Sequence, residues 1–252
     1  MSSMVMVHGA FCGGWAFERF RRPFEQAGWT VAAPDLPGHA ATDPPDAVCG
    51  LSMRHYADAV ADTCARQSAP PVLVGHSLGG LVALMAARRT PVRALVLFAP
   101  SAPWGVTGFS MEEAATAFGV QMLGPFPTGA MEPDADIMRR FSLDKVSKAD
   151  ARALIARMRR ESAKALSETL NWWLDPFMTT SLGAGASAPS LVLVGDQDRV
   201  HPPATVRQTA ARIGGDLRVL ASKSHWPFLE AGWEAVADDV LSWLAGQERA
   251  AA

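Results

Sequence analysis

The most informative segment of the chain is Pro71-Val-Leu-Val-Gly75-His76-Ser77-Leu78-Gly79-Gly80. It joins a short apolar run to a helical pattern through Gly-His-Ser-Leu-Gly, a G-x-S-x-G motif in the strand–turn–helix setting that this motif requires. A serine at so sharp a turn is held in strained backbone, with its hydroxyl above the sheet. Gly75 and Gly79 have no Cβ atom, so the helix can pack close to the strand. Ser77 is therefore the predicted nucleophile.

A serine hydroxyl is a weak nucleophile at neutral pH, so it needs a histidine base, and the base needs an orienting acid. In this structural setting the acid and then the histidine follow the serine along the chain. Of the six histidines, only His201 and His225 follow Ser77. His225 comes after the last predicted strand and is the predicted base. His201 lies next to Pro202 and is assigned to the start of a helix.

The acid is expected after the preceding strand, in Leu191-Val-Leu-Val-Gly195-Asp196-Gln197-Asp198-Arg199. Two aspartates compete for the role. Asp198 lies further along the loop, so it can reach toward the carboxyl edge of the sheet, where ligand chemistry gathers in open α/β sheets. Asp196 better suits a turn hydrogen bond or a surface ion pair. We therefore predict Asp198 as the acid and keep Asp196 as the alternative.

Two donors for the negative oxygen of a tetrahedral intermediate are also expected. The first is the backbone N–H of Leu78, the residue after the nucleophile. The second is expected from the glycine-rich loop His8-Gly9-Ala10-Phe11-Cys12-Gly13-Gly14-Trp15. Gly9 permits an unusual backbone conformation there, and the N–H of Ala10 can point into the site. Leu78 and Ala10 are therefore the predicted oxyanion-hole residues.

Short apolar, β-branched runs alternate with helical patterns along the chain. The predicted strands are Met4–Val7, Trp29–Ala33, Val72–Val74, Ala94–Phe98, Leu191–Val194 and Leu217–Leu220. The predicted helices lie near Ala16–Ala27, Met53–Gln67, Leu78–Arg89, Pro203–Ile213 and Trp233–Leu244. Strands that are apolar along their whole length are expected to be buried on both faces. The alternation predicts an α/β fold with a parallel, doubly wound sheet.

The alternation stops in residues 103–189, where no strand is predicted. The helices expected there are Met111–Met122, Pro133–Phe141 and Ser147–Trp173. So long a stretch without a strand exceeds what one crossover connection needs. We therefore predict a helical cap over 103–189, inserted into a core formed by 1–102 and 190–252. Ordinary helices covering the sheet are the alternative interpretation.

Composition limits the class of protein. The 252 residues are 49% hydrophobic, enough for one well-buried core. Because the formal net charge is -2 and no long basic block occurs, no nucleic acid or anionic membrane surface is expected as a partner. No apolar run approaches the roughly 20 residues of a membrane helix, and the N-terminal residues lack the features of a secretory signal. We therefore expect a cytoplasmic protein.

The three cysteines, Cys12, Cys49 and Cys64, are an odd number without metal-ligand spacing. They predict neither a disulfide framework nor a metal site. We also expect no cofactor. The expected partner is a small-molecule ester substrate, and the expected assembly is a monomer or a homodimer.

In these motifs the chain resembles the α/β-hydrolase superfamily over nearly its whole length. The matching segments are His8-Gly9, Asp35-Leu-Pro-Gly-His39, Gly75–Gly80, Gly195–Asp198 and Ser224-His225. Within the superfamily, Val5-Met-Val-His-Gly-Ala-Phe-Cys-Gly-Gly-Trp15 is similar to small esterases related to plant methyl esterases and hydroxynitrile lyases. The resemblance implies a three-layer α/β-hydrolase fold. Its mostly parallel sheet of about six strands would lack the first two strands of the full fold.

Two positions separate esterases from lyases in that group. The lyases carry Thr after the first His and Lys after the catalytic His, whereas this chain has Gly9 and Trp226. The resemblance thus implies a carboxylesterase-like serine hydrolase that cleaves a small, partly apolar ester, thioester or lactone through an acyl-enzyme. Ser77 excludes a haloalkane dehalogenase, whose nucleophile is Asp. A C–C bond hydrolase or perhydrolase on the same triad, and a ligand-binding receptor with little turnover, stay as alternatives.

Four side chains are expected to contact the substrate. Phe11 and His76 neighbour the predicted catalytic residues, and Trp104 and Trp172 belong to the predicted cap. Large apolar side chains of this kind can line an acyl pocket, and they can equally form the core of the cap. The substrate is therefore described only as small and partly apolar.

Overall fold

The computed structural model describes residues 2–108, 110–124, 126–183, 185 and 187–251. Six strands form one sheet in the order β2-β1-β3-β4-β7-β8, and every neighbouring pair is parallel. The strands are β1 (Ser3–Val7), β2 (Thr30–Ala32), β3 (Val72–His76), β4 (Ala94–Phe98), β7 (Ser190–Gly195) and β8 (Asp216–Leu220). The predicted parallel sheet of about six strands is confirmed, with strand ends that differ from the predicted ones by at most two residues.

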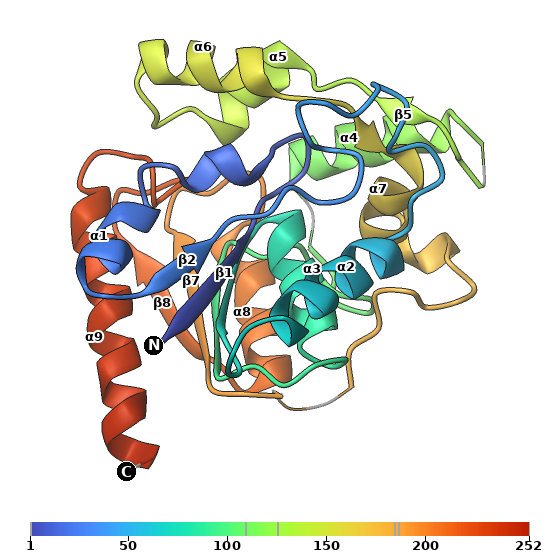
Figure 1. Cartoon of the computed structure of the whole chain (residues 1–252). Coiled ribbons are helices and arrows are strands. Elements are labelled where there is room, and N and C mark those ends of the chain that lie inside the picture. Colours follow the sequence, from blue (N-terminus) through green and yellow to red (C-terminus); the bar gives the residue numbers. More distant parts are fainter. Residues whose placement is uncertain (1, 109, 125, 184, 186, 252) are drawn as a thin grey trace.

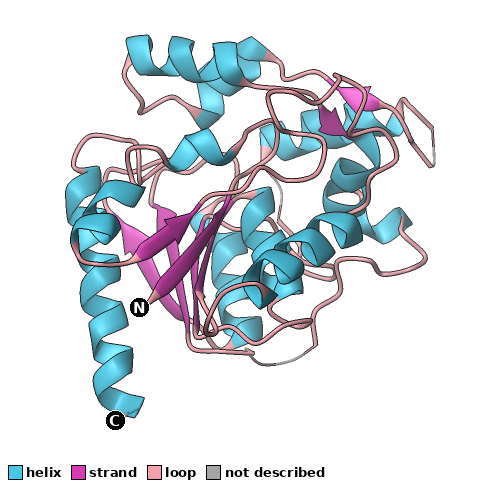
Figure 2. Ribbon diagram, in the orientation of Figure 1, coloured by secondary structure: helices cyan, strands magenta, loops and turns pink. Residues whose placement is uncertain are grey.

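Helices cover both faces of this sheet (Figures 1 and 2). Helices α1 (Arg21–Gln26) and α9 (Trp233–Ala251) lie on one face. Helices α2 (Met53–Ala65), α3 (Leu78–Ala86) and α8 (Pro203–Ile213) lie on the other. The predicted three-layer α/β fold is thereby confirmed. None of the helices in the described ranges is both long and apolar enough to cross a membrane.

The helix expected over Ala16–Ala27 is instead a 3₁₀ turn, η1 (Gly14–Phe17), followed by the separate helix α1. Pro23 gives the reason. In a continuous helix it would remove an interior hydrogen bond and its ring would clash with the carbonyl of Arg19. In the first turn of α1 that N–H has no helical partner in any case, so proline is tolerated there.

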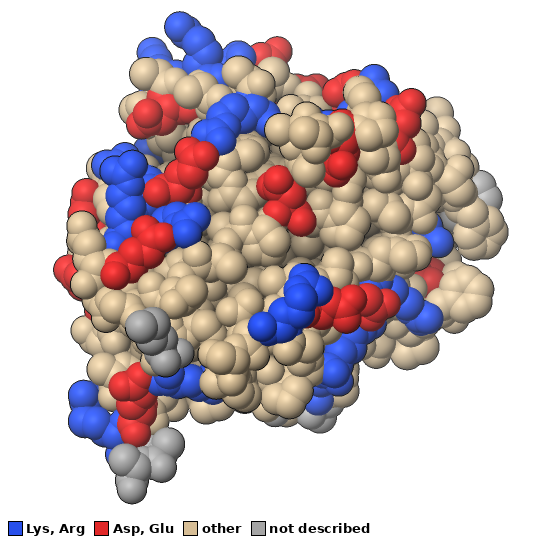
Figure 3. Space-filling model, in the orientation of Figure 1, with Lys and Arg blue, Asp and Glu red and all other residues tan. Residues whose placement is uncertain are grey.

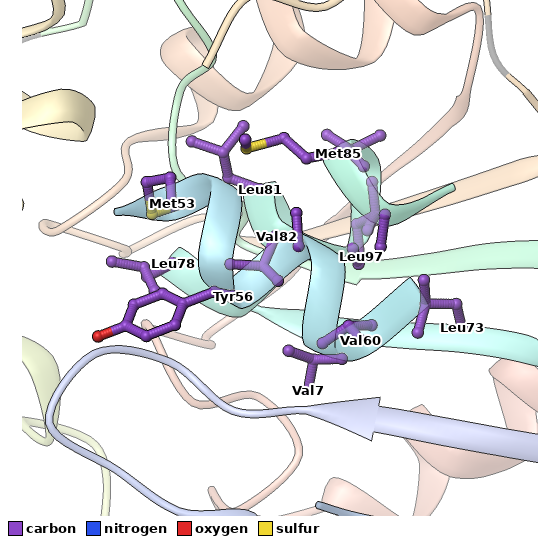
Figure 4. Close-up of a cluster of buried hydrophobic side chains, with 14 of the residues drawn as sticks. Val7, Met53, Tyr56, Val60, Leu73, Leu78, Leu81, Val82, Met85 and Leu97 are labelled. Carbon is purple, nitrogen blue, oxygen red and sulfur yellow. The ribbon is translucent and has the colours of Figure 1, made fainter. Parts of the chain in front are cut away.

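Alternate residues of the central strands belong to opposite layers of the core, as the two-residue repeat of a strand requires. In β1, Val5 and Val7 pack toward α2 and α3, in the cluster drawn in Figure 4. Met4 and Met6 pack with the aromatic side chains that α1 and α9 contribute on the other face. All four side chains are fully buried, and each such burial contributes about 1.5–3 kcal/mol to folding. Burial of both faces is confirmed for this strand.

The turn from β3 into α3 has the strained backbone expected for the nucleophile. Ser77 lies at φ 53° and ψ -123°, a region that non-glycine residues rarely adopt. Glycine allows the close packing around it. A Cβ atom on Gly79 would lie 2.2 Å from the carbonyl oxygen of His8, and one on Gly75 would lie 2.4 Å from the carbonyl oxygen of Gly79. The helix therefore starts nearly in contact with the neighbouring strand β1.

The segment between β4 and β7, which we call the cap, covers the carboxyl edge of the sheet (Figure 1). Its elements are α4 (Met111–Gln121), β5 (Ala130–Met131), α5 (Ala135–Ile137), the π-helical turn η2 (Met138–Ser142), α6 (Lys148–Arg157), β6 (Glu161–Ser162), α7 (Ala163–Leu170) and the 3₁₀ turn η3 (Trp172–Leu174). The cap is mainly helical, as expected, but two predictions are wrong. Strands β5 and β6 form an antiparallel pair where none was expected, and the helix over Ser147–Trp173 is interrupted between α6 and α7.

The interruption has a long-range cause. The backbone N–H of Arg159 donates to the carbonyl oxygen of Phe11, in the loop after β1, at 2.8 Å. Two residues later, Glu161 turns its side chain into the interior and is fully buried. Contacts with the core thus outweigh the helical propensity of this stretch.

Charged side chains of both signs are interspersed on the face of the molecule in Figure 3, without a large basic area. Several form exposed ion pairs, such as Arg157 with Glu18 at 2.7 Å. This distribution agrees with the net charge of -2. Exposed pairs of this kind contribute little to stability, about 0–1 kcal/mol each.

Replacing Gly79 with alanine is expected to lower the free energy of unfolding by about 1–3 kcal/mol, because overpacking forces the backbone to shift. Gly246→Ala in α9 is the matched control. Its new Cβ atom would meet only the end of Arg249, at 3.9 Å, and alanine in a helix interior is favoured by roughly 0.5–1 kcal/mol. Chemical denaturation of both variants gives the comparison. A Gly79→Ala protein as stable as the Gly246→Ala protein would contradict the close contact.

Candidate active site

Loops that follow five of the parallel strands meet at the carboxyl edge of the sheet, because the strands all end there. Together with the cap they enclose a cavity of about 90 Å³. Its polar lining includes Ser77, Ser101, Glu113, His201 and His225. Three of these residues were predicted or considered from the sequence, whereas Ser101 and Glu113 were not.

Asp198 and His225 form a buried pair. Oδ2 of Asp198 lies 2.9 Å from Nδ1 of His225. The other carboxylate oxygen, Oδ1, accepts the backbone N–H groups of Val200 and His201, both at 2.9 Å. The carboxylate is thus fixed in orientation and can hold His225 in the tautomer with hydrogen on Nδ1. Asp196, the alternative acid, is exposed.

The loop that carries His225 is held from two sides. The carboxylate of Glu230 accepts the backbone N–H groups of Ser224 at 2.9 Å and of Trp226 at 3.0 Å. Nε2 of His76 lies 2.9 Å from the carbonyl oxygen of His225. Burial, and to a lesser extent the neighbouring His225, keep the pKa of His76 well below its usual value, so the ring is neutral and donates here. His76, which is predicted to contact the substrate, lines the cavity and also positions the His225 backbone.

The Ser77 hydroxyl contacts a histidine that was not expected in the site. Its Oγ lies 3.3 Å from Nε2 of His201. Among the described residues it makes no hydrogen bond with His225, although hydrogen bonds of this kind often tighten only in the substrate complex. His201 precedes α8, as predicted, but its side chain faces the cavity rather than merely starting the helix. One feature of the sequence could have indicated this position: His201 lies three residues after Asp198, in a loop at the carboxyl edge of the sheet.

Besides Ser77, two side chains contact the ring nitrogens of His201. Nε2 lies 3.0 Å from the hydroxyl of Ser101, which follows β4. Nδ1 lies 2.6 Å from Oε1 of Glu113, on cap helix α4. Burial would lower the pKa of His201, but the charge and hydrogen bond of Glu113, together with the charge of Asp198, outweigh burial and raise it. No pattern in the sequence indicates Glu113, because its approach depends on how the cap folds over the sheet.

The predicted oxyanion-hole residues, Ala10 and Leu78, both line the cavity. Leu78 is the first residue of α3, so its N–H has no partner within the helix. The N–H of Ala10 makes no hydrogen bond within the described residues. The preceding His8 anchors the loop, because its Nε2 accepts the N–H of Leu36 at 2.9 Å. Burial lowers the pKa of His8 to about 3, so the ring is neutral and can accept.

Phe11, which is predicted to contact the substrate, lines the cavity in a left-handed conformation with φ 64°. Its backbone N–H donates to Oε2 of Glu161 at 3.3 Å. The same carboxylate accepts the Tyr56 hydroxyl at 2.6 Å and pairs with Nε2 of His39 at 3.2 Å. Glu161 belongs to the cap, so a buried cap carboxylate fixes the loop that carries Ala10. No pattern in the sequence indicates this contact.

Trp104 and Trp172 do not line the cavity beside Ser77, contrary to their prediction as substrate contacts. Their rings pack against each other in a T-shaped arrangement with centroids 5.2 Å apart. Trp172 lines a neighbouring cavity instead. The apolar lining that the cap supplies at Ser77 comes from smaller side chains and one phenylalanine: Ile137, Met138, Phe141, Met158, Leu166 and Leu170.

Comparison with known proteins identifies relatives of the chain. The sequence pattern described as the Alpha/beta hydrolase family matches residues 4–239. A pimeloyl-(acyl-carrier protein) methyl ester esterase of Neisseria meningitidis is 32% identical over 238 residues, which cover 91% of this chain and 72% of that protein. The protein of the same name from Stenotrophomonas maltophilia is 30% identical over 241 residues, with coverage of 90% and 86%.

Solved structures share the fold at lower sequence identity. The crystal structure of a methylesterase, MES16, from Arabidopsis superposes with a TM-score of 0.74 and 16% identity, over 97% of this chain and 99% of that chain. The crystal structure of polyneuridine aldehyde esterase gives a TM-score of 0.71 and 17% identity, with coverage of 96% and 98%. The fold expected from the resemblance to small esterases of the plant methyl esterase group is confirmed.

The buried pair of His39 and Glu161 is expected to make stability depend on pH. Burial lowers the pKa of His39, but Glu161 outweighs it and raises the pKa above the usual 6.5. Burial raises the pKa of Glu161, but His39 and the hydrogen bonds outweigh it and lower the pKa below 4.5. The stability from His39 is complete below 6.5 and is lost as pH rises through its raised pKa. The stability from Glu161 is complete above 4.5 and is lost as pH falls through its lowered pKa.

The stabilisation from this pair should therefore be largest at a pH between the usual pKa values of glutamate and histidine. We expect the Tm of the wild type to exceed that of His39→Gln most at about pH 5–6, and the gap to narrow toward about pH 9. Differential scanning calorimetry across this range measures the gap. A gap that stays constant with pH would mean that packing, not charge, explains the effect of His39.

Proposed function

This chain belongs to the α/β-hydrolase family, and we propose that its Ser77, His225 and Asp198 hydrolyse a small, partly apolar carboxylic ester through an acyl-enzyme. The chain is an ester-cleaving hydrolase, like its named relatives. The observation that carries the assignment of residues is the 2.9 Å contact between Asp198 and His225 in the cavity that Ser77 lines. It supplies a base and its orienting acid beside a serine in strained backbone.

The proposed reaction has two halves. Oγ of Ser77 attacks the ester carbonyl while His225 takes the hydroxyl proton through Nε2, and Asp198 stabilises the resulting imidazolium. The N–H groups of Ala10 and Leu78 hold the negative oxygen of the tetrahedral intermediate. His225 then protonates the departing alcohol. In the second half water attacks the acyl carbon, and the same groups release the acid.

Cavity size supports a small substrate. The space beside Ser77 is about 90 Å³, whereas an engineered protein cavity that binds benzene has about 150 Å³. Its lining is mainly apolar, with the cap contributing Met138, Phe141 and Leu166. Two relatives are named for methyl esters of an acyl group. Methyl esters of short and medium acyl chains are therefore the first substrates to test, followed by the matching thioesters and lactones.

Ser77→Ala is expected to abolish both turnover of p-nitrophenyl acetate and covalent labelling by a fluorophosphonate, a loss on the order of 10⁴–10⁶ in kcat. Asp198→Asn should reduce kcat by on the order of 10⁴, because it favours the wrong tautomer of His225. Asp196→Asn is the matched control and should keep most of the activity. Mass spectrometry locates the label. Labelling of another serine, or tight ester binding without turnover by the wild type, would contradict the proposal.

Phe141→Ala is expected to enlarge the cavity and shift the preferred acyl chain toward longer esters, with a lower KM for butyrate than the wild type shows. Phe118→Ala, on the same cap but 64% exposed and outside the cavity lining, is the matched control. The measurement is kcat/KM for p-nitrophenyl esters from acetate to octanoate. Equal profiles for the two variants would show that the acyl group binds elsewhere.

A further inference from the structure

Two histidine–carboxylate pairs lie at the cavity that Ser77 lines. One is His225 with Asp198, and the other is His201 with Glu113. The two imidazole rings lie 5.2 Å apart between centroids, in a T-shaped arrangement. The reaction proposed above assigns a task only to the first pair. In the second pair, His201 is nevertheless buried and contacts the reacting oxygen, and Glu113 is largely buried.

We propose that His201 is a second catalytic histidine, which donates a hydrogen bond from Nε2 to Oγ of Ser77 and accelerates release of the acyl group from that oxygen. Glu113 on cap helix α4 keeps His201 in the charged, donating form. The proposal rests on the proposed esterase function and adds a residue to it.

The hydrogen-bond directions follow from the partners of each ring nitrogen. The Glu113 carboxylate, 2.6 Å from Nδ1, can only accept, so Nδ1 carries a hydrogen. Nε2 faces the hydroxyls of Ser77 at 3.3 Å and Ser101 at 3.0 Å. Hydroxyls both donate and accept, so the charge of His201 decides the direction. A charged ring has one N–H at Nε2, which lies between the two hydroxyls and donates to Oγ of Ser77 as well as to Ser101, whereas a neutral ring accepts from one of them.

The groups facing His201 favour the charged ring. Glu113 approaches from α4, and the Asp198 carboxylate accepts the backbone N–H of His201 at 2.9 Å. Both negative groups raise the pKa of His201 although burial lowers it. Two other histidines approach from the core, His225 from the loop after β8 and His76 from the end of β3. The pKa of His76 is held so low that this ring adds no positive charge.

A charged His201 does not compete with His225 for the serine proton. A serine hydroxyl has one hydrogen and two lone pairs. The N–H of His201 occupies a lone pair, so the hydrogen stays available to Nε2 of His225. A charged imidazole cannot accept a proton. The two histidines therefore have different roles: His225 transfers protons, and His201 stabilises negative charge on Oγ of Ser77.

The hydrogen bond from His201 lowers the barrier most in the step that releases the acyl group from Ser77. Water attacks the acyl carbon and gives one proton to His225, and the bond between that carbon and Oγ of Ser77 then breaks. Oγ takes the bonding electron pair and receives the proton back from His225, so atoms and charge balance. His201 gives a hydrogen bond throughout and transfers no proton. A charged donor already aimed at the atom that gains negative charge lowers this barrier.

The test is stopped-flow hydrolysis of p-nitrophenyl acetate by the full chain. His201→Phe removes the donor, and we expect a burst of about one equivalent of p-nitrophenol followed by turnover slowed roughly 10- to 100-fold, the usual worth of a charge-assisted hydrogen bond. His201→Gln keeps a neutral donor and should lose less. Glu234→Gln, an exposed carboxylate on α9, is the control and should match the wild type.

Glu113→Gln supplies a second, independent measurement. Without the carboxylate, burial lowers the pKa of His201, so the ring loses its proton at lower pH. The alkaline limb of the kcat profile should therefore move to lower pH, with a burst appearing there. This profile decides the question if circular dichroism shows that His201→Phe does not fold.

Two outcomes would overturn the inference while leaving the esterase function intact. In one, His201→Phe slows the first release of p-nitrophenol as much as later turnover, so that no burst appears. In the other, Glu113→Gln keeps the wild-type pH profile. If the wild type itself neither hydrolyses the ester nor reacts with a fluorophosphonate at Ser77, the proposed function fails, and this inference fails with it.

Discussion

The close contact between the start of helix α3 and strands β1 and β3 fixes the geometry of the whole site. Gly75 and Gly79 allow backbone to lie where a Cβ atom would be only 2.2–2.4 Å from a carbonyl oxygen. Ser77 lies between the two glycines at positive φ, and Leu78, the first residue of the helix, lines the cavity with an N–H that has no helical partner. The loop after β1 lies against the same turn. The proposed nucleophile and both proposed oxyanion donors are thus positioned by one packing constraint.

Buried carboxylates then hold the loops that carry the remaining groups. Glu161 anchors the loop at Phe11, Glu230 anchors both sides of His225, and Asp198 orients the His225 ring. Each of these three carboxylates accepts at least one backbone N–H, and those of Glu161 and Asp198 also contact a histidine side chain. A carboxylate can accept several such bonds at once, which makes it an efficient partner for irregular backbone. Removing one would leave buried N–H groups unpaired, at a cost of about 1–3 kcal/mol each.

The sequence predicted those features that depend on local pattern and chain order. The strand–turn–helix around Ser77, the six strands and the choice of Asp198 and His225 follow from neighbouring residues and from where parallel strands end. The misses are long-range. Glu113 and Glu161 reach the core only because the cap folds over it. Arg159 was predicted to lie within a helix, but its backbone N–H instead donates to the carbonyl oxygen of Phe11. Trp104 and Trp172 were selected by residue type, and type alone does not distinguish a cavity wall from a packed aromatic pair.

The anchoring of Phe11 by Glu161 bears on how new specificities can be engineered on this scaffold. Exchanging the segment between β4 and β7 for that of another family member looks like a modular graft, since it enters and leaves the sheet at adjacent strands. Here the graft would remove the counter-charges of His39 and His201 from the scaffold. A chimaera would have to carry carboxylates at the positions of Glu113 and Glu161, or inherit a loop after β1 that is stable without them. Which residues can be exchanged together therefore depends on the ion pairs between cap and core, and not only on where the chain leaves the sheet.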